Sequence, residues 1–245
     1  MDATRPFWLT AFLDFPAAEF DRGAGFWARA TGWPLSQARG EHDEFASLLP
    51  PAGGDYLRLQ RLGTGETRVH LDVHVPDPEE AALAAHERGA RIVRQAHPGL
   101  VVMQSPAGFD FCLTRQDRRG TPEPQAWVSG HRSRVSQLCL DVPPEAHLGE
   151  LEFWTATLSG RVRPSATRAE FSWIDLDGEF AIRVLVQRLD LAGRVGAHLD
   201  IGTDDRTAEV ARLTAQGALV RAVRDGWTVL EAPGGTSFCV LDGGL

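Results

Sequence analysis

The sequence repeats itself, and this repeat limits the possible folds more than any other feature of the chain. Four short matches occur in the same order in both halves, each separated by 127 or 128 residues. The matched pairs are Phe26-Trp27 with Phe153-Trp154, His70-Leu71-Asp72 with His198-Leu199-Asp200, Gly89-Ala90 with Gly217-Ala218, and Phe111-Cys112 with Phe238-Cys239. A single fixed offset indicates that one structural unit occurs twice. We therefore predict a tandem duplication within the 245 residues.

A weaker repeat divides each half again into two modules. A Leu-Asp pair in a short β-like run occurs four times, and each run is followed by a helix-compatible segment that ends in glycine. The predicted helix ends are Gly32, Gly89, Gly160 and Gly217, because glycine suits the left-handed position that closes a helix. Strand-like runs separated by turn signals follow each helix, as at Asp177-Gly178. Each module therefore reads as β-α-β-β-β, which predicts an α+β fold.

Composition and linker signals indicate the domain boundaries, the partners and the cellular location. The segment after Arg115 is charged and contains two prolines, as linkers do, so we predict domain 1 at residues 1–117, a linker at 118–133 and domain 2 at 134–245. The chain carries 33 acidic against 25 basic residues, a net charge of −8, which argues against nucleic-acid and membrane partners. The three cysteines form no CxxC pair, and the first residues do not resemble a signal peptide. We expect a cytoplasmic protein.

The module order and three motifs resemble the vicinal oxygen chelate superfamily, which includes glyoxalases, bleomycin-resistance proteins and extradiol dioxygenases. The motifs are Phe26-Trp27 before a helix that ends in glycine, the stretch from His70 to Asp77, and the stretch from Ser105 to Cys112, each with its counterpart in the second half. The resemblance covers nearly the whole chain. It implies two glyoxalase-like domains, each built from two β-α-β-β-β modules that form a curled mixed sheet with a cleft.

The same resemblance implies where a divalent metal would bind in the first half. Metal-using members place His or Gln and a Glu on the first strand of each module and on the last strand. His70 matches one position, and Asp110 stands where the family has Glu. The first strand offers only Thr10 or Phe12, and Gln60 is an additional oxygen donor. A hard divalent ion needs imidazole and anionic oxygen together, so this set is incomplete.

The second half lacks a different ligand. His198 matches again, and Gln137 or Cys139 lies on the opening strand, but Ser237 replaces the carboxylate. We therefore expect no metal cofactor, with a divalent metal held by His70, Asp110 and Gln60, or by His198 and Gln137, as the alternative. A second interpretation of His70 and His198 is that each hydrogen-bonds the backbone or a neighbouring module and was inherited through the duplication.

Other polar residues are interpreted as structural. Asp14, Asp72, Asp141 and Asp200 recur with the modules and are predicted to be solvated or to bridge modules. Cys112 and Cys239 lie between apolar residues and are predicted to be small buried packing groups. The remaining histidines show no ligand spacing and are predicted to be solvated or in loops; they are His42, His74, His86, His97, His131 and His147. Motifs for nucleotide phosphates and for hydrolase triads do not occur.

Tryptophan is abundant, with seven residues in the chain. Trp27 and Trp154 lie in predicted helices and are predicted to be core residues. Four others lie near strand ends or turns, where an indole can line a cleft. They are Trp8, Trp33, Trp173 and Trp227. Core or interdomain packing of these four is the alternative.

These observations lead to three functional hypotheses. The first is binding of a small aromatic or amphipathic molecule without a metal, in a sheet cleft lined by the four tryptophans together with His70, Asp110, Gln137 and His198. The second is a divalent-metal-dependent lyase, isomerase or dioxygenase. The third is a protein-interaction or structural module. We expect either a monomer that forms an internal pseudo-dimer or a homodimer.

Overall fold

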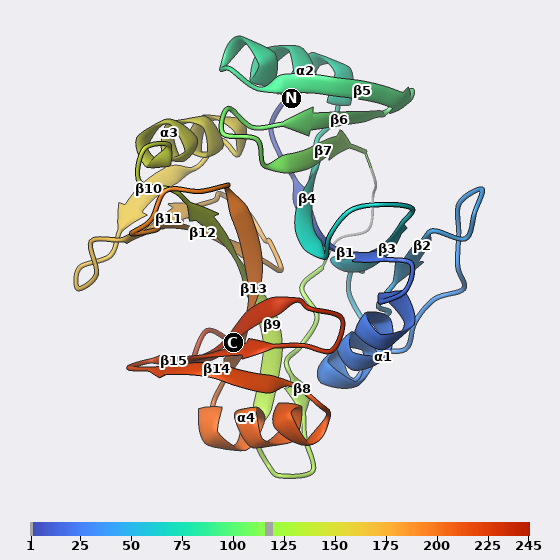
Figure 1. Cartoon of the computed structure of the whole chain (residues 1–245). Helices are drawn as coiled ribbons and strands as arrows, with labels where there is room; N and C mark the ends of the chain where they lie inside the picture. The colour runs from blue at the N-terminus through green and yellow to red at the C-terminus, as the bar shows by residue number, and fades with distance from the viewer. Residues whose placement is uncertain (1, 116–119) are drawn as a thin grey trace. The chain divides into compact units, whose positions relative to one another are not determined.

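The computed structural model describes residues 2–115 and 120–245 (Figure 1). The predicted end of domain 1 at residue 117 and the first residues of the predicted linker lie outside these ranges. The elements of the first repeat are β1 (Trp8–Pro16), α1 (Phe20–Thr31), β2 (Phe45–Ser47), β3 (Leu57–Leu62), β4 (Arg68–His74), α2 (Pro78–Glu87), β5 (Arg91–His97), β6 (Leu100–Gln104) and β7 (Asp110–Thr114). Those of the second are β8 (Gln125–Ala126), β9 (Arg132–Val142), α3 (His147–Thr157), β10 (Arg161–Pro164), β11 (Phe171–Asp175), β12 (Arg183–Arg188), β13 (Gly196–Thr203), α4 (Arg206–Ala215), β14 (Leu219–Arg224), β15 (Trp227–Glu231) and β16 (Ser237–Asp242).

The strands form two mixed sheets, one for each repeat. The first has the order β2-β3-β1-β4-β7-β6-β5, and the second has the order β10-β11-β12-β9-β13-β16-β15-β14 with β8 paired to β9. Three modules show the predicted β-α-β-β-β order. The first module departs from it, because the segment after α1 makes only isolated bridges, Leu35 with Leu48 and Arg39 with Phe45. Pro34 and Gly40 interrupt this segment, which accounts for the missing strand.

The helix ends follow the predicted glycines at three of four positions. Gly32, Gly89 and Gly217 have φ values of 73°, 97° and 105°, in the left-handed region. After α3 the left-handed residue is Ser159 instead, with φ of 51°. Gly160 serves a different need, since a Cβ on it would lie 2.5 Å from the Cγ2 atom of Ile174. The prediction of a left-handed Gly160 was therefore wrong.

The chain forms two compact units, and each unit combines elements from both repeats. The first unit comprises Met1–Ala11, His70–Gly120 and Cys139–Ala197; the second comprises Phe12–Val69, Thr121–Leu138 and His198–Leu245. In the first unit α2 covers β5, β6 and β7 (Figure 1). In the second unit α4 packs on β15 and β16. Within the described residues, no helix is long and apolar enough to span a bilayer.

The core of the first unit is an aromatic cluster between α3 and β7. Phe153 and Trp154 meet the ring of Phe111 at centroid distances of 5.9 and 5.0 Å. The indole Nε1 of Trp154 donates to Glu150 Oε2 at 2.8 Å, and the other oxygen of Glu150 accepts from the amide of Ala107 at 2.7 Å. All three rings are buried, and Glu150 is 1% exposed. The carboxylate therefore connects α3 to the turn before β7.

The second unit contains the repeat of this cluster between α1 and β16. Phe26 and Trp27 meet Phe238 at 5.8 and 5.4 Å. These rings are also fully buried. Among the described residues, the indole Nε1 of Trp27 has no hydrogen-bond acceptor. The apolar packing is thus repeated in the two units, whereas the hydrogen bond of the indole is not.

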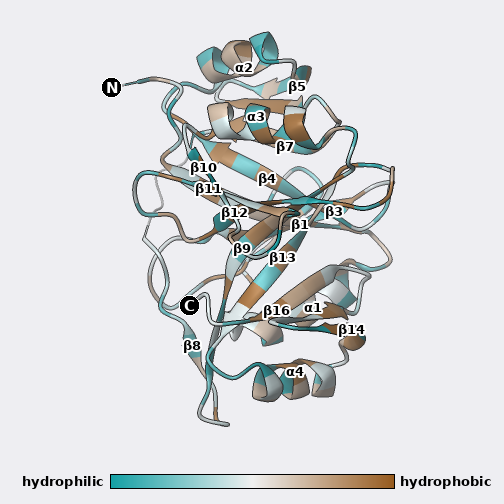
Figure 2. Cartoon of the chain, turned by 90° about the vertical axis from the view of Figure 1, so that its left-hand side faces the viewer, coloured by the Kyte–Doolittle hydropathy of each residue, from teal (hydrophilic) through white to brown (hydrophobic). Residues whose placement is uncertain are grey.

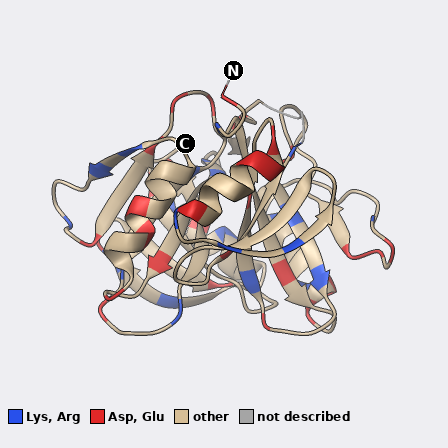
Figure 3. Cartoon of the chain, turned by 90° about the horizontal axis from the view of Figure 1, so that it is seen from above, with Lys and Arg blue, Asp and Glu red and all other residues tan. Residues whose placement is uncertain are grey.

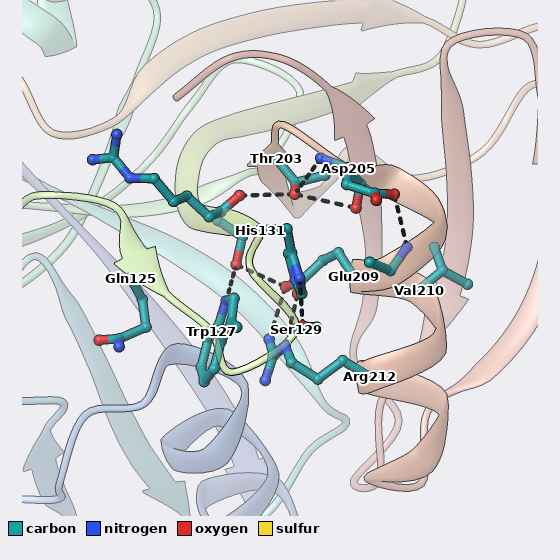
Figure 4. Close-up of polar contacts among 12 residues, drawn as sticks. Gln125, Trp127, Ser129, His131, Thr203, Asp205, Glu209, Val210 and Arg212 are labelled. Carbon is teal, nitrogen blue, oxygen red and sulfur yellow. Dashed lines mark hydrogen bonds and ion pairs between the residues drawn. The ribbon is translucent and has the colours of Figure 1, made fainter.

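A buried polar network holds the segment before β9 against α4 in the second unit (Figure 4). Glu209 is fully buried and accepts from His131 Nε2 at 2.7 Å, from Ser133 Oγ at 2.9 Å, and from Arg212 at 2.7 Å on each oxygen. The guanidinium of Arg212 lies 3.5 Å from the ring centre of Trp127. His131 lies in the loop before β9, as one of the two predicted alternatives has it, but it is only 4% exposed, so the prediction of a solvated side chain was wrong. The network compensates the charge of Glu209 in the interior.

The two aromatic clusters generate a first prediction. Trp154→Phe removes a hydrogen bond to a buried carboxylate, whereas Trp27→Phe removes an N–H group that has no acceptor. A hydrogen bond to a charged group contributes about 1.5–3 kcal/mol, so we expect Trp154→Phe to lower the free energy of unfolding by about 2 kcal/mol more than Trp27→Phe. Urea denaturation of the two variants measures this difference, and equal losses would contradict the role of Glu150.

The Glu209 network generates a second prediction. Burial raises the pKa of Glu209, but the hydrogen bonds and charge of Arg212, followed by His131 and Ser133, outweigh this effect and lower the pKa below its usual value. A carboxyl with a lowered folded-state pKa stabilises the fold above its unfolded pKa and loses that contribution as pH falls through the folded pKa. We expect Glu209→Gln to cost about 3 kcal/mol at neutral pH, and the difference from wild type to shrink below about pH 4.5.

Urea denaturation at a series of pH values measures this effect. Glu231→Gln is the matched control, because Glu231 pairs with Arg221 at 2.8 Å in a largely exposed position. The control substitution should change the stability much less. A Glu209→Gln difference that stays constant down to acid pH would contradict the prediction.

Candidate functional site

A histidine, an aspartate and a cysteine come together on β4 and β7 in the first unit. Side chains alternate along a strand, so His70 and Asp72 lie on one face of β4 while Leu71 lies on the other. β7 runs parallel to β4 with Asp72 opposite Cys112. The ligand atoms of the three residues all lie within 4.8 Å of one another, and His70 Nε2 is 3.6 Å from Asp72 Oδ1. We call these residues the first His-Asp-Cys cluster.

The environment of this cluster is largely closed to solvent. His70 and Asp72 are 7% and 6% exposed, and Cys112 is half-buried. Burial raises the pKa of the Cys112 thiol to about 11, and the nearby charge of Asp72 raises it further. Asp72 was predicted to be solvated or to bridge modules, so the prediction of a solvated side chain was wrong.

The second unit contains the repeat of this cluster, formed by His198, Asp200 and Cys239. Asp200 lies opposite Cys239 in the parallel pair of β13 and β16, and the ligand atoms again lie within 4.8 Å of one another. His198 Nε2 is 3.3 Å from Asp200 Oδ1. Gln137 Nε2 donates to Asp200 Oδ2 at 2.5 Å. This second His-Asp-Cys cluster thus connects two predicted site residues, His198 and Gln137, through Asp200. Asp200 is 2% exposed, so the prediction that it is solvated was wrong.

Figure 2 shows the alternation that builds both clusters, as hydrophilic and hydrophobic bands along β4 and β13. Leu71 and Leu199 are fully buried, opposite Phe111 and Phe238. The polar residues between them therefore lie on the other face of each sheet. The alternation itself was visible in the sequence, but the strand pairing that adds the cysteines was not.

The positions that the family resemblance implies for a metal do not form a complete donor set. The hydroxyl of Thr10 is 2.9 Å from His74 Nε2, and Asp110 accepts from Gln104 Nε2 at 2.7 Å. In the part of the chain that the structure describes, Asp110 joins no group of three His, Cys, Asp or Glu ligand atoms within 4.8 Å. In the second repeat, Ser237 is exposed and brings no charge. These residues do not fit a hard divalent ion.

Two further residues from the predicted site lie on or beside strands of the first sheet. Gln60 lies on β3 opposite Phe45, where it is half-buried. Phe12, the alternative to Thr10 on β1, is a buried aromatic residue. An aromatic ring cannot coordinate a divalent ion, so the alternative register of β1 also provides no ligand.

A pocket of about 300 Å³ in the first unit is lined by the end of β11, the loop that follows it and the first residue of β12. Its lining residues are Trp173, Ile174, Asp175, Leu176, Gly178, Phe180, Ile182 and Arg183. Arg163 on β10 lies beside the pocket residues, with its guanidinium 4.7 Å from the ring centre of Trp173 and its Nε 2.8 Å from Asp175 Oδ2. Gly178, in the loop between β11 and β12, has φ of 120°. The pocket therefore combines an aromatic wall with one acidic and one basic side chain.

The other three tryptophans predicted to line a cleft lie elsewhere. Trp8 is 1% exposed and forms part of the core of the first unit. Trp33 is buried edge-on against Tyr56 and lines a cavity of only about 10 Å³. Trp227 is half-buried on β15, opposite Leu241. Trp173 alone of the four lines the 300 Å³ pocket.

Two more histidines differ from the prediction that they are solvated or in loops. His74 is fully buried on β4, where it bonds Thr10, and His147 is buried at the start of α3. Burial lowers the pKa of His147, and Arg188 lowers it further.

Charged residues of both signs are interspersed along the chain (Figure 3), which agrees with the absence of a basic composition in the sequence.

Comparison with solved structures gives matches over nearly the whole chain. The Mn(II)-bound glyoxalase from Novosphingobium aromaticivorans is 16% identical, with a TM-score of 0.70 over 97% of this chain and 82% of that one. The 2,3-dioxygenase LapB from Pseudomonas sp. KL28 is 13% identical, with a TM-score of 0.62 over 98% and 92%. Homoprotocatechuate 2,3-dioxygenase from Brevibacterium fuscum is 12% identical, with a TM-score of 0.62 over 98% and 82%. At these identities the likeness shows the fold alone.

No curated protein matches the chain. Comparison with protein families does give a match. The model of the family described as "Glyoxalase-like domain" matches residues 10–114 and again residues 137–241. The two matches follow the internal repeat and cover most of the chain. The predicted α+β fold of tandem glyoxalase-like domains is thereby confirmed. The chain belongs to the glyoxalase-like domain family and carries the domain twice.

Proposed function

We propose that this protein binds a small aromatic or amphipathic organic molecule in the Trp173 pocket. The observation that carries the proposal is the pocket itself, whose volume of about 300 Å³ lies at the lower end of the range for small-molecule sites. Its wall is mostly apolar, with Trp173, Ile174 and Phe180 beside one acidic and one basic residue. A few polar groups in an apolar wall are what orients a small ligand.

The charges around the pocket favour a ligand with a negative group. Asp175 is paired with Arg163, so the carboxylate is already balanced by a guanidinium. Arg183 is the basic residue of the wall itself, and guanidinium groups pair well with carboxylates and sulfonates. An aromatic ring on Trp173 with an acidic group toward Arg183 is the ligand that this wall fits.

Binding of this kind uses no metal ion in the pocket. Of the residues that line it, only Asp175 carries a side chain of the His, Cys, Asp or Glu type. One carboxylate does not hold a divalent ion. At this site the protein therefore acts by binding, without making or breaking a covalent bond. A cytoplasmic location and a monomer or homodimer stay predictions.

A divalent-metal-dependent lyase, isomerase or dioxygenase is the second candidate. It is favoured by the two His-Asp-Cys clusters, which gather ligand atoms on the sheets of both repeats. Structures with the same fold include a Mn(II)-bound glyoxalase and 2,3-dioxygenases. Turnover of a hemithioacetal or of a catechol by metal-loaded protein, and none by chelator-treated protein, would favour this candidate over simple binding.

The pocket generates a third prediction, for which 1-anilinonaphthalene-8-sulfonate is the probe because it combines aromatic rings with a sulfonate. We expect the chelator-treated native protein to bind the dye, and Trp173→Ala to weaken binding about tenfold through loss of the stacking surface. Dye fluorescence and isothermal titration measure the affinity. Arg221→Gln is the control, since it removes an ion pair between β14 and β15 and Arg221 is not a lining residue of the pocket. Equal affinities of wild type and Trp173→Ala would refute this pocket as the binding site.

A further inference from the structure

The two His-Asp-Cys clusters have the donor atoms and the spacing of a zinc-type metal site. Zinc binds sulfur at about 2.3 Å and nitrogen or oxygen at about 2.0–2.2 Å, so two ligands of a tetrahedral ion lie about 3.3–3.8 Å apart. The distances from His Nε2 to Asp Oδ1 are 3.6 Å in the first cluster and 3.3 Å in the second. The cysteine sulfur completes three ligand atoms within 4.8 Å in each cluster.

Charge favours the same ion. A carboxylate and a thiolate together carry two negative charges, which a divalent cation neutralises in a buried position. Asp72 and Asp200 are 6% and 2% exposed. A thiolate also selects against Mg²⁺ and Ca²⁺, which prefer oxygen ligands, and favours zinc and other thiophilic ions.

The donor set differs from the one that the family resemblance implies. That set uses a residue of β1 and a carboxylate at the start of the last strand, which here are Thr10 and Asp110. The clusters share only the histidine with it. Their other two ligands lie two residues further along β4 and β7, at Asp72 and Cys112, and the parallel register places these two side by side.

We propose that each His-Asp-Cys cluster binds one Zn²⁺ ion, so that the chain holds two ions in repeated sites. In each site the S–H bond of the cysteine breaks, its proton passes to solvent, and the sulfur bonds the ion. Histidine contributes a neutral nitrogen and aspartate one oxygen. Three protein ligands leave the fourth tetrahedral position to water. The proposal rests on these six residues and does not depend on the organic ligand of the Trp173 pocket.

The two sites differ in the hydrogen bond made by Gln137 and by its counterpart in the first repeat. Gln137 donates to Asp200 Oδ2 at 2.5 Å, which leaves Oδ1 on the side of His198. The residue 127 positions earlier is Thr10, and its hydroxyl is directed to His74 instead. A hydrogen bond behind a metal ligand typically improves affinity 10- to 100-fold. The second site is therefore the one whose affinity depends on Gln137.

The test is a metal titration of the intact chain after dialysis against a chelator, with no organic ligand present. Co²⁺ serves as the spectroscopic probe, because a bound thiolate gives a charge-transfer absorption band, and Zn²⁺ is then added in competition. We expect two equivalents of Co²⁺, displaced by Zn²⁺. Cys112→Ser and Cys239→Ser should each remove one equivalent, and the double variant should remove both along with the band.

Further variants separate a metal ligand from a structural role. Asp72→Asn keeps the size of the side chain and should also remove one equivalent. Gln137→Ala should weaken one site about 10- to 100-fold and leave the other unchanged. His97→Gln, which removes an exposed histidine, should retain both equivalents. Circular dichroism establishes that each variant is folded.

Two results would overturn the proposal. One is less than about half an equivalent of bound Co²⁺ or Zn²⁺ at micromolar free metal, since a three-ligand site with a thiolate is expected to be filled there. The other is a charge-transfer band that survives in the folded double cysteine variant, which would assign the thiolate to Cys139. Dye binding in the Trp173 pocket is measured on chelator-treated protein, so the two proposals fail separately.

Discussion

The exchange of aromatic helices between the repeats is the contact on which the architecture depends. Phe26 and Trp27 of the first repeat pack on Phe238 of the second, and Phe153 and Trp154 of the second pack on Phe111 of the first. Burial of such large rings contributes several kcal/mol each. Because α1 and α3 place aromatic rings on a strand of the other repeat, the compact units combine both halves. Each of these two aromatic clusters therefore draws on both halves of the sequence.

The same contacts explain which parts of the fold the sequence predicts. Module order, turns and most helix ends follow from short-range patterns, and the repeat lets each element be located twice. The exposed strands β5, β10 and β14 carry long runs of solvent-facing residues, so they show little of the alternation that marks a half-buried strand. The packing of a helix on the other repeat joins residues that are far apart in the sequence, so local sequence patterns do not predict it. Sequence therefore predicts the modules and not the units.

The candidate site shows the same division between local pattern and strand pairing. His70 and His198 could be singled out because a motif surrounds them, and Trp173 because it lies near a turn. Asp72 and Cys112 are forty residues apart, and only the parallel register of β4 and β7 brings them together. An aspartate in an alternating strand resembles a solvated residue until the structure shows what covers its face. Three of the four candidate tryptophans do not line the 300 Å³ pocket for the same reason, because their burial depends on packing that the sequence does not show.

Comparison of the two repeats separates what the scaffold requires from what each site has gained. Both repeats retain histidine, aspartate and cysteine at equivalent positions, while the residues behind them differ, with Thr10 in one and Gln137 in the other. The aromatic packing accounts for Phe111 and Phe238, which alternate with these residues on the other face. The aromatic packing does not explain the buried carboxylates, because burying an apolar side chain in the same place would cost less free energy. Two buried aspartates, each beside an imidazole and a thiol, are explained more simply by a cation bound in each cluster than by two separate structural roles.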